Sequence, residues 1–262
     1  MAGRRFQDQV VIVTGGGSGL GEADAKLFAA EGAHVVLADV DAANGERVRK
    51  EIGSAASFAS LDVRDEEAWR RLVSDVVSAH GRLDVLVNSA GILHLDSPES
   101  ITGDALRRAW DVNVTGTILG CKHALGAMRK GGRAGAIVNI SSITAIRGVP
   151  EVTSYSITKG AVAAYTRSLA VHCAQEGLPV RANAVLPAAI DTPMHRQFSN
   201  MMDADGIPMS GVQEDTNLSS SIGRADDVAA LVVYLASSDA RFISGEAIVL
   251  DNTQSVTLGN IP

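Results

Sequence analysis

The sequence predicts an α/β protein: a single doubly wound domain with a seven-stranded parallel sheet and helices on both faces. Short apolar runs alternate with longer amphipathic stretches along most of the 262 residues, which is the order of a parallel sheet with crossover helices. A glycine-rich turn, TGGGSGLG at 14–21, joins the first apolar run to the first amphipathic stretch. No repeat, linker or low-complexity tract divides the chain. We therefore expect residues 1–262 to form one domain.

Seven apolar runs have the length of strands and are bounded by polar residues or glycine. They are continuously apolar, which is typical of strands that are buried on both faces. The predicted strands are 9–14, 33–39, 57–62, 83–88, 135–141, 179–187 and 246–251.

Helices are predicted between these strands from amphipathic spacing and end signals. The segment 65–81, for example, has an Asp cap, an acidic first turn and a Gly stop. The predicted helices are 18–32, 43–52, 65–81, a long helical region from about 102 to 130, 154–176 and 225–237.

Composition excludes several classes of protein. Hydrophobic residues make up 46% and charged residues 20% of the chain, which permits a full core and argues against disorder. The net charge is −7 and no long basic run exists, so neither nucleic acid nor an anionic membrane is an expected partner. The apolar run near the N-terminus is too short for a signal or a membrane span. We expect a cytoplasmic protein.

The cysteines and histidines indicate no metal site. Cys121 and Cys173 lie far apart without a CxxC partner, and we expect both to be buried free thiols. The six histidines show neither HExxH nor HxH spacing, so no zinc ligand set is expected.

The turn at 14–21 favours nucleotide binding. Its glycines let the backbone approach a pyrophosphate closely, and the following helix N-terminus offers unpaired N–H groups. Glycine-rich turns can also merely connect elements, but this one lies at a strand-to-helix junction.

Two carboxylates end neighbouring predicted strands. Asp39 can accept hydrogen bonds from adenosine ribose hydroxyls and would repel a 2′-phosphate, which favours NAD. The alternative for Asp39 is a cap of the next helix, but Asp41 is better placed for that. Asp62, followed by Val63, could meet the adenine edge or be an ordinary loop carboxylate, and the residues leave both open.

Five features occur in a fixed order: TGGGSGLG, NSAG at 88–91, Asn113, NISS at 139–142 and YSITK at 155–159. With them, the chain resembles the short-chain dehydrogenase/reductase family from about residue 8 to 251. It looks most like bacterial hydroxysteroid and cyclic-alcohol dehydrogenases. The resemblance implies a Rossmann-type fold and an oxidoreductase that interconverts a secondary alcohol and a ketone.

Tyr155 and Lys159 lie on one face of a predicted helix, one turn apart. A free phenol has a pKa of about 10, too high for ready proton exchange at neutral pH. A neighbouring ammonium favours the phenolate, so we expect Lys159 to lower the pKa of Tyr155. Tyr155 is then a general base for oxidation and a general acid for reduction. The resemblance implies the same role, and it adds a hydrogen bond from Lys159 to the nicotinamide ribose.

Ser142 lies at the carboxyl end of a predicted strand, where ligands of open α/β sheets bind. A hydroxyl there can donate to the substrate oxygen. Ser141 is the alternative, and the family spacing to Tyr155 favours Ser142. Asn113 lies in the long helical region, where asparagine is unfavourable and needs a local reason. The resemblance implies that Asn113 holds a water that relays protons to Lys159, and the alternative is a surface asparagine.

The resemblance extends to the segment VLPAAIDTPM at 185–194. It places Thr192 at the nicotinamide carboxamide, and Ala188 stands where glycine is common. Ser89 replaces the usual second Asn of the NSAG motif. Together the motifs assign cofactor binding to Gly15, Ser18, Gly19, Leu20, Gly21, Asp39, Asp62, Val63, Asn88, Ala90, Gly91, Tyr155, Lys159, Pro187, Ile190 and Thr192.

Residues 193–224 form the one long stretch without clear periodicity, and such stretches are commonly functional lids or disordered. Methionine is flexible and suits adaptable apolar pockets. We therefore expect a lid at 193–220 over a lipophilic or alicyclic substrate, steroids included. Its apolar residues are Met194, Phe198, Met201, Met202, Ile207, Met209 and Val212.

Two other functions were weighed against an NAD-dependent oxidoreductase. Asp39, with no Lys or Arg in the glycine turn or at position 40, disfavours an NADPH-dependent 3-oxoacyl-thioester reductase. A nucleotide-binding regulator without turnover would usually lose one of Ser142, Tyr155 and Lys159, and all three are present.

The helix at 154–176 also indicates assembly. One face is committed to Tyr155 and Lys159, while its other positions remain small and apolar, and an exposed face of this kind is normally covered. Family members pair this helix across a two-fold axis, so we expect a homotetramer. The residues concerned are Ala161, Val162, Ala164, Leu169 and Val171.

Overall fold

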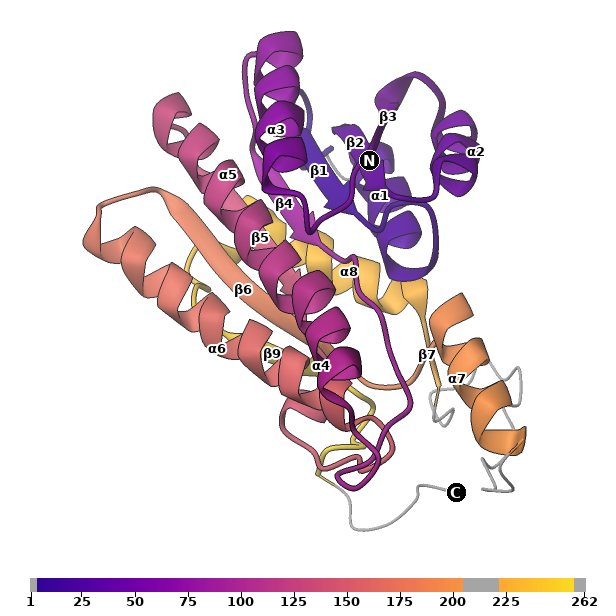
Figure 1. Cartoon of the computed structure of the whole chain (residues 1–262). Coiled ribbons are helices and arrows are strands. Elements are labelled where there is room, and N and C mark those ends of the chain that lie inside the picture. The colour runs from indigo at the N-terminus through magenta and orange to yellow at the C-terminus, as the bar shows by residue number, and fades with distance from the viewer. Residues whose placement is uncertain (1–3, 205–221, 257–262) are drawn as a thin grey trace.

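The computed structural model of the chain describes residues 4–204 and 222–256. Seven parallel strands form one sheet in the order β3-β2-β1-β4-β5-β6-β9 (Figure 1). This confirms the predicted seven-stranded parallel sheet. The strands are β1 (Val10–Thr14), β2 (His34–Asp39), β3 (Ala56–Ser60), β4 (Val85–Asn88), β5 (Gly135–Ile140), β6 (Val180–Pro187) and β9 (Ala247–Leu250).

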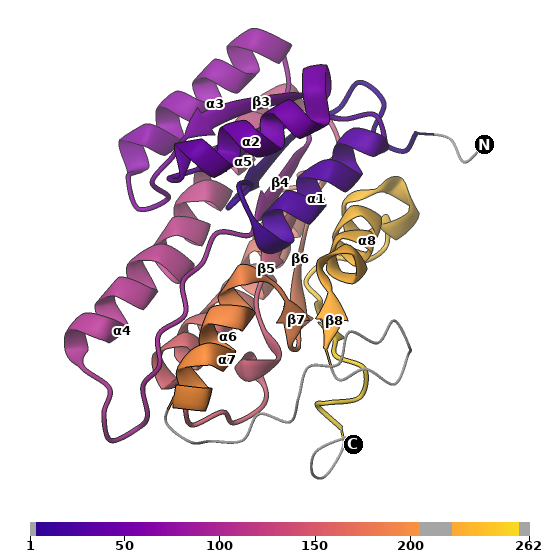
Figure 2. The same cartoon turned by 90° about the vertical axis from the view of Figure 1, so that its right-hand side faces the viewer.

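Helices cover both faces of the sheet (Figures 1 and 2). One face carries α1 (Gly19–Ala30), α2 (Ala42–Ile52) and α8 (Ala225–Ala236), and the other carries α3 (Glu66–His80), α5 (Gly116–Gly131) and α6 (Thr153–Gln175). The shorter elements are α4 (Gly103–Trp110), the π-turn η2 (Asp111–Thr115), α7 (Pro193–Ala204) and the 3-10 turns η1 (Gly53–Ala55), η3 (Ile143–Ala145) and η4 (Ser238–Ala240).

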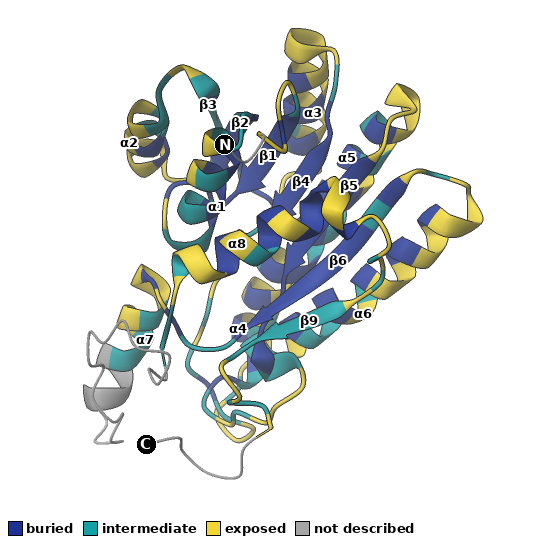
Figure 3. Cartoon of the chain, turned by 180° about the vertical axis from the view of Figure 1, so that it is seen from behind, coloured by how far each residue is buried: buried dark blue, intermediate teal, exposed yellow. Residues whose placement is uncertain are grey.

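Each face of the sheet has its own apolar core. Phe28 of α1 and Val232 of α8 pack on one side, and Trp69 of α3 and Leu169 of α6 pack on the other. The central strands are buried from both sides (Figure 3), which explains their continuous apolar sequences.

The strand order reverses between β1 and β4, which are neighbours in the sheet. Thr14 and Asn88, the last residues of these strands, lie opposite one another in the register. Chain connections leave in opposite directions here, so a crevice opens at the carboxyl ends of the strands, where doubly wound proteins bind ligands.

The predicted long helical region from 102 to 130 is confirmed, because α4 and α5 continue into one another through the π-turn at 111–115. One expectation about local structure needs correction. Residues 193–204, for which no regular structure was predicted, form helix α7, and a two-stranded parallel pair, β7 (Ile190–Asp191) with β8 (Gly223–Arg224), flanks this region. The rest of the expected lid, 205–220, lies outside the described residues, as do the side chains of Met201 and Met202.

The expected free face of α6 is smaller than predicted. Val162 and Leu169 are buried within the chain, because they face the sheet. Ala164 and Val171 are exposed, and Ala161 is half-buried.

Both cysteines are buried free thiols, as expected. Among the described residues no His, Cys, Asp or Glu side chains gather in a group of three that could hold a metal ion. Within residues 4–204 and 222–256, no helix combines the length and the apolar character needed to cross a membrane.

Candidate active site

The turn between β1 and α1 depends on its glycines. Gly15 and Gly19 have φ values of 67° and 57°, in the left-handed region that side chains disfavour. A Cβ on Gly21 would lie 2.3 Å from the Gly15 carbonyl oxygen. These residues let the chain turn from strand to helix and leave room beside the backbone.

The N-terminus of α1 faces the space beside this turn. Ser18 is the N-cap residue, but its side chain makes no capping hydrogen bond. The first-turn N–H groups and the positive end of the helix dipole therefore favour an anion such as a pyrophosphate. Across the turn, the Thr14 hydroxyl accepts hydrogen bonds of 3.1 Å from the backbone N–H groups of Ser89 and Ala90. The Thr14 side chain thereby links the carboxyl end of β1 to the segment that follows β4.

A cleft of about 480 Å³ runs along these strand ends. Pro187 and Ile190, assigned to the cofactor from sequence, line an adjoining cavity instead, and Asn88 lines neither. The other residues assigned to the cofactor all line the cleft: Gly15, Ser18, Gly19, Leu20, Gly21, Asp39, Asp62, Val63, Ala90, Gly91, Tyr155, Lys159 and Thr192.

Asp39 is fixed at one end of the cleft. One carboxylate oxygen accepts a 2.9 Å hydrogen bond from the Gly17 N–H, and the other accepts one of 2.9 Å from the Asp41 N–H. Each oxygen has further acceptor capacity. The Asp41 side chain caps α2 through the Asn44 N–H, so Asp39 is not needed there.

Asp62 is paired with Arg64, which belongs to none of the sequence motifs. The guanidinium lies 2.6 Å from the carboxylate, and this pairing lowers the pKa of Asp62. Both side chains line the cleft beyond Asp39. Asp62 therefore lines the cleft as an ion pair with Arg64.

The Asn88 side chain points into the protein. Its amide donates a 2.8 Å hydrogen bond to Asn139, which in turn donates to the Thr166 hydroxyl. Asn88 also lies 3.3 Å from the Cys121 sulfur. This buried polar network joins β4, β5 and α6, so Asn88 supports the cleft from beneath.

Tyr155 and Lys159 meet on α6 as their spacing predicted. The Lys159 ammonium lies 5.4 Å from the centre of the Tyr155 ring and donates a 2.8 Å hydrogen bond to the Ile140 carbonyl. Burial lowers the pKa of Lys159 to about 8. Burial also raises the pKa of Tyr155 to about 12, opposed by a hydrogen bond with Ser142. The structure therefore does not show the expected lowering of the Tyr155 pKa by Lys159. Burial of the phenol, which disfavours the charged phenolate, is the largest influence on this pKa.

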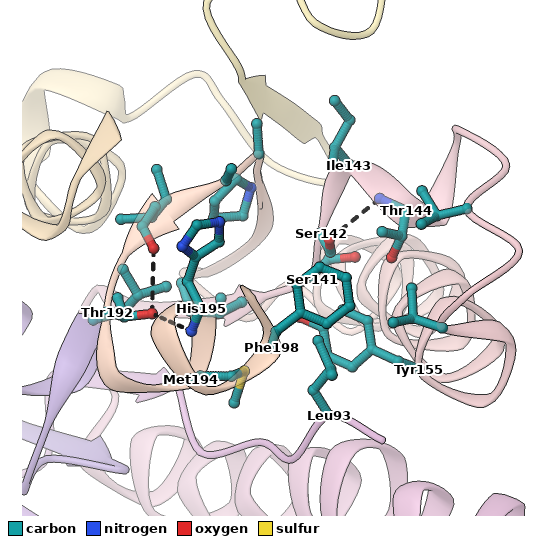
Figure 4. Close-up of a pocket in the computed structure, with 18 residues that line it drawn as sticks. Leu93, Ser141, Ser142, Ile143, Thr144, Tyr155, Thr192, Met194, His195 and Phe198 are labelled. Carbon is teal, nitrogen blue, oxygen red and sulfur yellow. Dashed lines mark hydrogen bonds between the residues drawn. The ribbon is translucent and has the colours of Figure 1, made fainter. Parts of the chain in front are cut away.

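The two candidate serines have separate places. The Ser141 hydroxyl donates a 2.7 Å hydrogen bond to the Lys159 carbonyl and so holds α6 against β5. The Ser142 hydroxyl lies beside the phenol of Tyr155 and accepts a 3.2 Å hydrogen bond from the Thr144 N–H (Figure 4). Ser142 is thus the serine next to the phenol.

Local hydrogen bonds explain why an asparagine, Asn113, is accommodated within a helical segment. It lies in the π-turn and is 1% exposed. Its side chain accepts from the Ile92 N–H at 2.8 Å and donates to the Ile92 carbonyl at 2.9 Å and to the Thr158 hydroxyl at 3.0 Å. This excludes the surface alternative. A Cβ built on Gly91 would lie within 3.4 Å of both Asn113 and the Lys159 ammonium, so the two side chains are near neighbours.

A second cavity, of about 220 Å³, adjoins the cleft (Figure 4). Tyr155 and Thr192 line both spaces. The wall around Ser142 and Tyr155 comes from the connection between β5 and α6, and the facing wall comes from α7 through Met194, His195 and Phe198.

The segment after β6 adopts an ordinary backbone. Ala188, which replaces the common glycine, is not among the described residues with positive φ, and its N–H donates a 3.0 Å hydrogen bond to the Leu250 carbonyl. Thr192 is 8% exposed, and its hydroxyl accepts a 3.2 Å hydrogen bond from the His195 N–H. The substitution at 188 leaves this segment intact.

Comparison with known proteins accounts for the arrangement. A sequence profile described as "Enoyl-(Acyl carrier protein) reductase" matches residues 15–252. The chain belongs to the short-chain dehydrogenase/reductase family.

Its relatives in this family match it from end to end. The chain is 34% identical to a 3-beta-hydroxysteroid dehydrogenase of Comamonas testosteroni over 95% of this chain and 96% of that protein. It is 36% identical to a cyclopentanol dehydrogenase of Comamonas sp. (strain NCIMB 9872), over 94% and 97% of the two chains. A solved 3-ketoacyl-(acyl-carrier-protein) reductase from Brucella melitensis, complexed with NADH, superposes with a TM-score of 0.85 at 32% identity, covering 96% and 100%.

In this short-chain dehydrogenase/reductase, the cleft fits a nicotinamide dinucleotide. It combines a glycine turn with close backbone approach, an uncapped helix N-terminus and a carboxylate with spare acceptor capacity. A bound nicotinamide would supply or accept a hydride. The chain's own groups would hold the cofactor at Asp39 and Lys159 and place a hydroxyl pair, Ser142 and Tyr155, beside it.

Several lining residues were missed from sequence. Arg64 and Ile92 directly follow motifs, and that adjacency was the available signal. The missed residues of the cavity come from separate connections and from helix α7, and no common spacing marks them: Leu93, Thr144, Val149, Val152 and His195.

Proposed function

We propose that this protein is an NAD-dependent oxidoreductase that interconverts a secondary alcohol and a ketone on a lipophilic or alicyclic substrate. The observation that carries the proposal is the place of Tyr155. Its phenol lies beside the Ser142 hydroxyl and lines both the glycine-rich cleft and the apolar cavity. A substrate oxygen in the cavity would meet both hydroxyls, while its carbon faces the cleft.

The chain's own residues would move the proton. In reduction, the Tyr155 hydroxyl donates its proton to the oxygen formed from the carbonyl, and in oxidation the phenolate takes the proton of the alcohol. The Ser142 hydroxyl donates to the same oxygen and stabilises its developing charge. Lys159, held by the Ile140 carbonyl, favours the phenolate electrostatically when it is charged. We infer that Asn113 is a positioning residue, because it links the turn at Ile92 to α6 close to Lys159.

The choice of NAD over NADP rests on the charges around Asp39. A 2′-phosphate would lie against this carboxylate, and the cations nearby are already paired. Arg47 lies 2.7 Å from Glu22 and 2.8 Å from Glu51, and Arg64 is paired with Asp62. Each of these cations is therefore already neutralised by a carboxylate, which makes it a weaker partner for a 2′-phosphate.

Assembly is part of the proposal. Ile157 and Val171 of α6 and Trp110 of α4 are apolar side chains between 41% and 56% exposed. Helices α4 and α6, which carry these side chains, pack together. We propose that a second copy covers them in a homotetramer, and a stable monomer at micromolar concentration in light scattering would refute this.

The test of function is the change in absorbance of reduced nicotinamide with a panel of steroid, alicyclic and acyl-thioester substrates, each with NAD(H) and NADP(H). We expect turnover of secondary alcohols or their ketones with NAD(H). Turnover of 3-oxoacyl thioesters with NADPH alone would replace the proposal with a thioester reductase. Cofactor binding without turnover of any compound would favour a regulator.

A further inference from the structure

The cavity beside Tyr155 is apolar except for a few groups. Its apolar wall is formed by Leu20, Leu93, Ile143, Val149, Val152 and Phe198. Four hydroxyls in the wall already have roles: Ser142 and Tyr155 at the reacting oxygen, and Ser141 and Thr192 in hydrogen bonds with backbone groups. Two further polar side chains line the cavity, Thr144 and His195.

The Thr144 hydroxyl oxygen is buried and makes no hydrogen bond to any described group. A buried hydroxyl without a partner costs free energy, so such groups are uncommon unless a ligand or water completes them. The backbone N–H of the same residue donates to Ser142. Thr144 is therefore a residue of the cavity wall next to Ser142.

His195 faces the cavity from the opposite wall (Figure 4). Its backbone N–H is bonded to Thr192, but its ring makes no hydrogen bond within residues 4–204 and 222–256. Burial lowers the pKa of His195, and its charged neighbours Asp191 and Arg196 act in opposite directions and are paired with each other at 2.5 Å. The imidazole is thus neutral at pH 7, with one N–H donor and one nitrogen acceptor available.

The volume of the cavity limits the substrate. A cavity of about 150 Å³ holds a single benzene ring, and drug-sized ligands occupy pockets of roughly 300–1,000 Å³. At about 220 Å³, this cavity fits one six-membered ring with small substituents better than a fused four-ring skeleton.

From these observations we propose, on the basis of the function proposed above, that the substrate is a single-ring alicyclic alcohol or ketone carrying a second oxygen. His195 and Thr144 hydrogen-bond that second oxygen and so determine specificity. A site that bonds a substrate hydroxyl discriminates strongly against the analogue that lacks it, because its own polar groups are then left unpaired.

The test compares cyclohexanol with 1,2-, 1,3- and 1,4-cyclohexanediol and a 3-hydroxysteroid, using NAD. We expect kcat/KM of the wild type for the best diol to exceed that for cyclohexanol by at least about tenfold. In His195→Phe and in Thr144→Val this ratio should fall at least about fivefold. His195→Gln and Thr144→Ser are the matched variants that keep a hydrogen-bonding group, and they should retain most of the ratio. If His195→Phe fails to fold, the Thr144 pair still tests the proposal.

The outcomes separate this inference from the proposed function. Equal kcat/KM for cyclohexanol and every diol, or an unchanged ratio in both His195→Phe and Thr144→Val, would overturn the second-oxygen site. A steroid preferred over every single-ring alcohol would overturn the inference and leave the oxidoreductase in place. Failure to oxidise any secondary alcohol or reduce any ketone would overturn both.

Discussion

The cleft and the cavity share Tyr155 but are built in different ways. The cleft is built around backbone: glycines of the β1–α1 turn, the N-terminus of α1 and the ends of β2 and β4, with a few side chains such as Asp39 and Lys159 along it. The cavity is made of side chains from η3, the segment after β6 and helix α7. A backbone site tolerates little variation, because any Cβ on Gly21 would collide with the turn, whereas side chains in a cavity wall can change one by one. Under the proposed function, the cleft would therefore fix the chemistry, and the cavity would be free to select the substrate.

The largest expected effect comes from the residue that joins the two regions. Tyr155→Phe should lower kcat by about 10³-fold, within the range for loss of general acid–base catalysis, and should leave NAD binding nearly unchanged. Turnover and the change in NADH fluorescence on binding measure the two separately. Tyr234→Phe, on α8 and 38% exposed, is the matched control and should retain full activity. A Tyr155→Phe enzyme that keeps a tenth of the wild-type rate would show that another group transfers the proton.

The next effect tests the cleft alone. Like charges about 4 Å apart repel by on the order of 4 kcal/mol at an effective dielectric constant of 20, and partial exposure of Asp39 reduces this. We expect kcat/KM to favour NAD over NADP by roughly two orders of magnitude, or about 2.7 kcal/mol. The double variant Asp39→Ser, Val40→Arg should narrow or reverse the preference, since it removes the repulsion and adds a phosphate partner. Equal values for both cofactors in the wild type would mean that Asp39 does not face the ribose.

The difference between the cleft and the cavity also explains which parts of the site the sequence could predict. Thirteen cofactor assignments line the cleft because a turn motif and strand ends determine where backbone goes. Asn88 fails as a lining residue because neighbouring side chains of a strand point to opposite faces, and the NSAG motif does not specify which face. The network with Asn139 and Thr166, which holds Asn88, forms only in three dimensions.

The parts of the site that were missed depend on contacts distant in sequence. The π-turn around Asn113 accompanies hydrogen bonds to Ile92 and Thr158, 21 and 45 residues away. Helix α7 was not predicted, although Met194 and Phe198 lie one turn apart and both face the cavity. Residues at this spacing are a helical signal, and it was obscured by the polar residues of the segment.

A third test measures whether burial or a nearby positive charge determines the pKa of Tyr155. Burial raises its pKa to about 12 in the free protein, two units above the ordinary 10. Ultraviolet difference titration of wild type against Tyr155→Phe isolates the phenolate of this residue. We expect no Tyr155 phenolate below pH 10 in the free protein, and a lower pKa when cationic NAD is bound, because a positive charge favours the phenolate.

The control for this titration is Lys159→Arg. The pKa of Lys159 is lowered to about 8, so its charge is lost above that pH, while arginine stays charged. The Arg variant should therefore ionise Tyr155 at a lower pH than the wild type. A wild-type phenolate already formed at pH 8 without cofactor would show that the charge of Lys159 outweighs burial, as the sequence alone suggested.

The smallest effect lies beneath the cleft, in the helix that supports the glycine turn. Asp24 of α1 is fully buried, and neither carboxylate oxygen has a hydrogen-bond partner among the described residues. Burial raises its pKa well above the usual 3.8. The folded protein therefore keeps a proton on Asp24 at pH values where the unfolded chain has lost it. Stability from this group is full below about pH 4 and declines as the pH rises toward the folded pKa.

Asp24→Asn replaces the protonated acid with a neutral group of the same shape, so folding no longer requires the uptake of a proton. Each unit of pKa shift corresponds to about 1.4 kcal/mol, and we expect the variant to be more stable than the wild type by at least about 1 kcal/mol at pH 8, with a smaller gain at pH 5.5. Thermal unfolding at the two pH values measures this, and Asp75→Asn, at an exposed carboxylate on α3, is the matched control that should change neither value. An Asn variant that is less stable at both pH values would mean that the Asp24 carboxylate is ionised and paired in the folded protein. In that case the rigid half of the site would owe part of its stability to a buried charge, and the contrast with the adaptable cavity would rest on electrostatics as well as on backbone geometry.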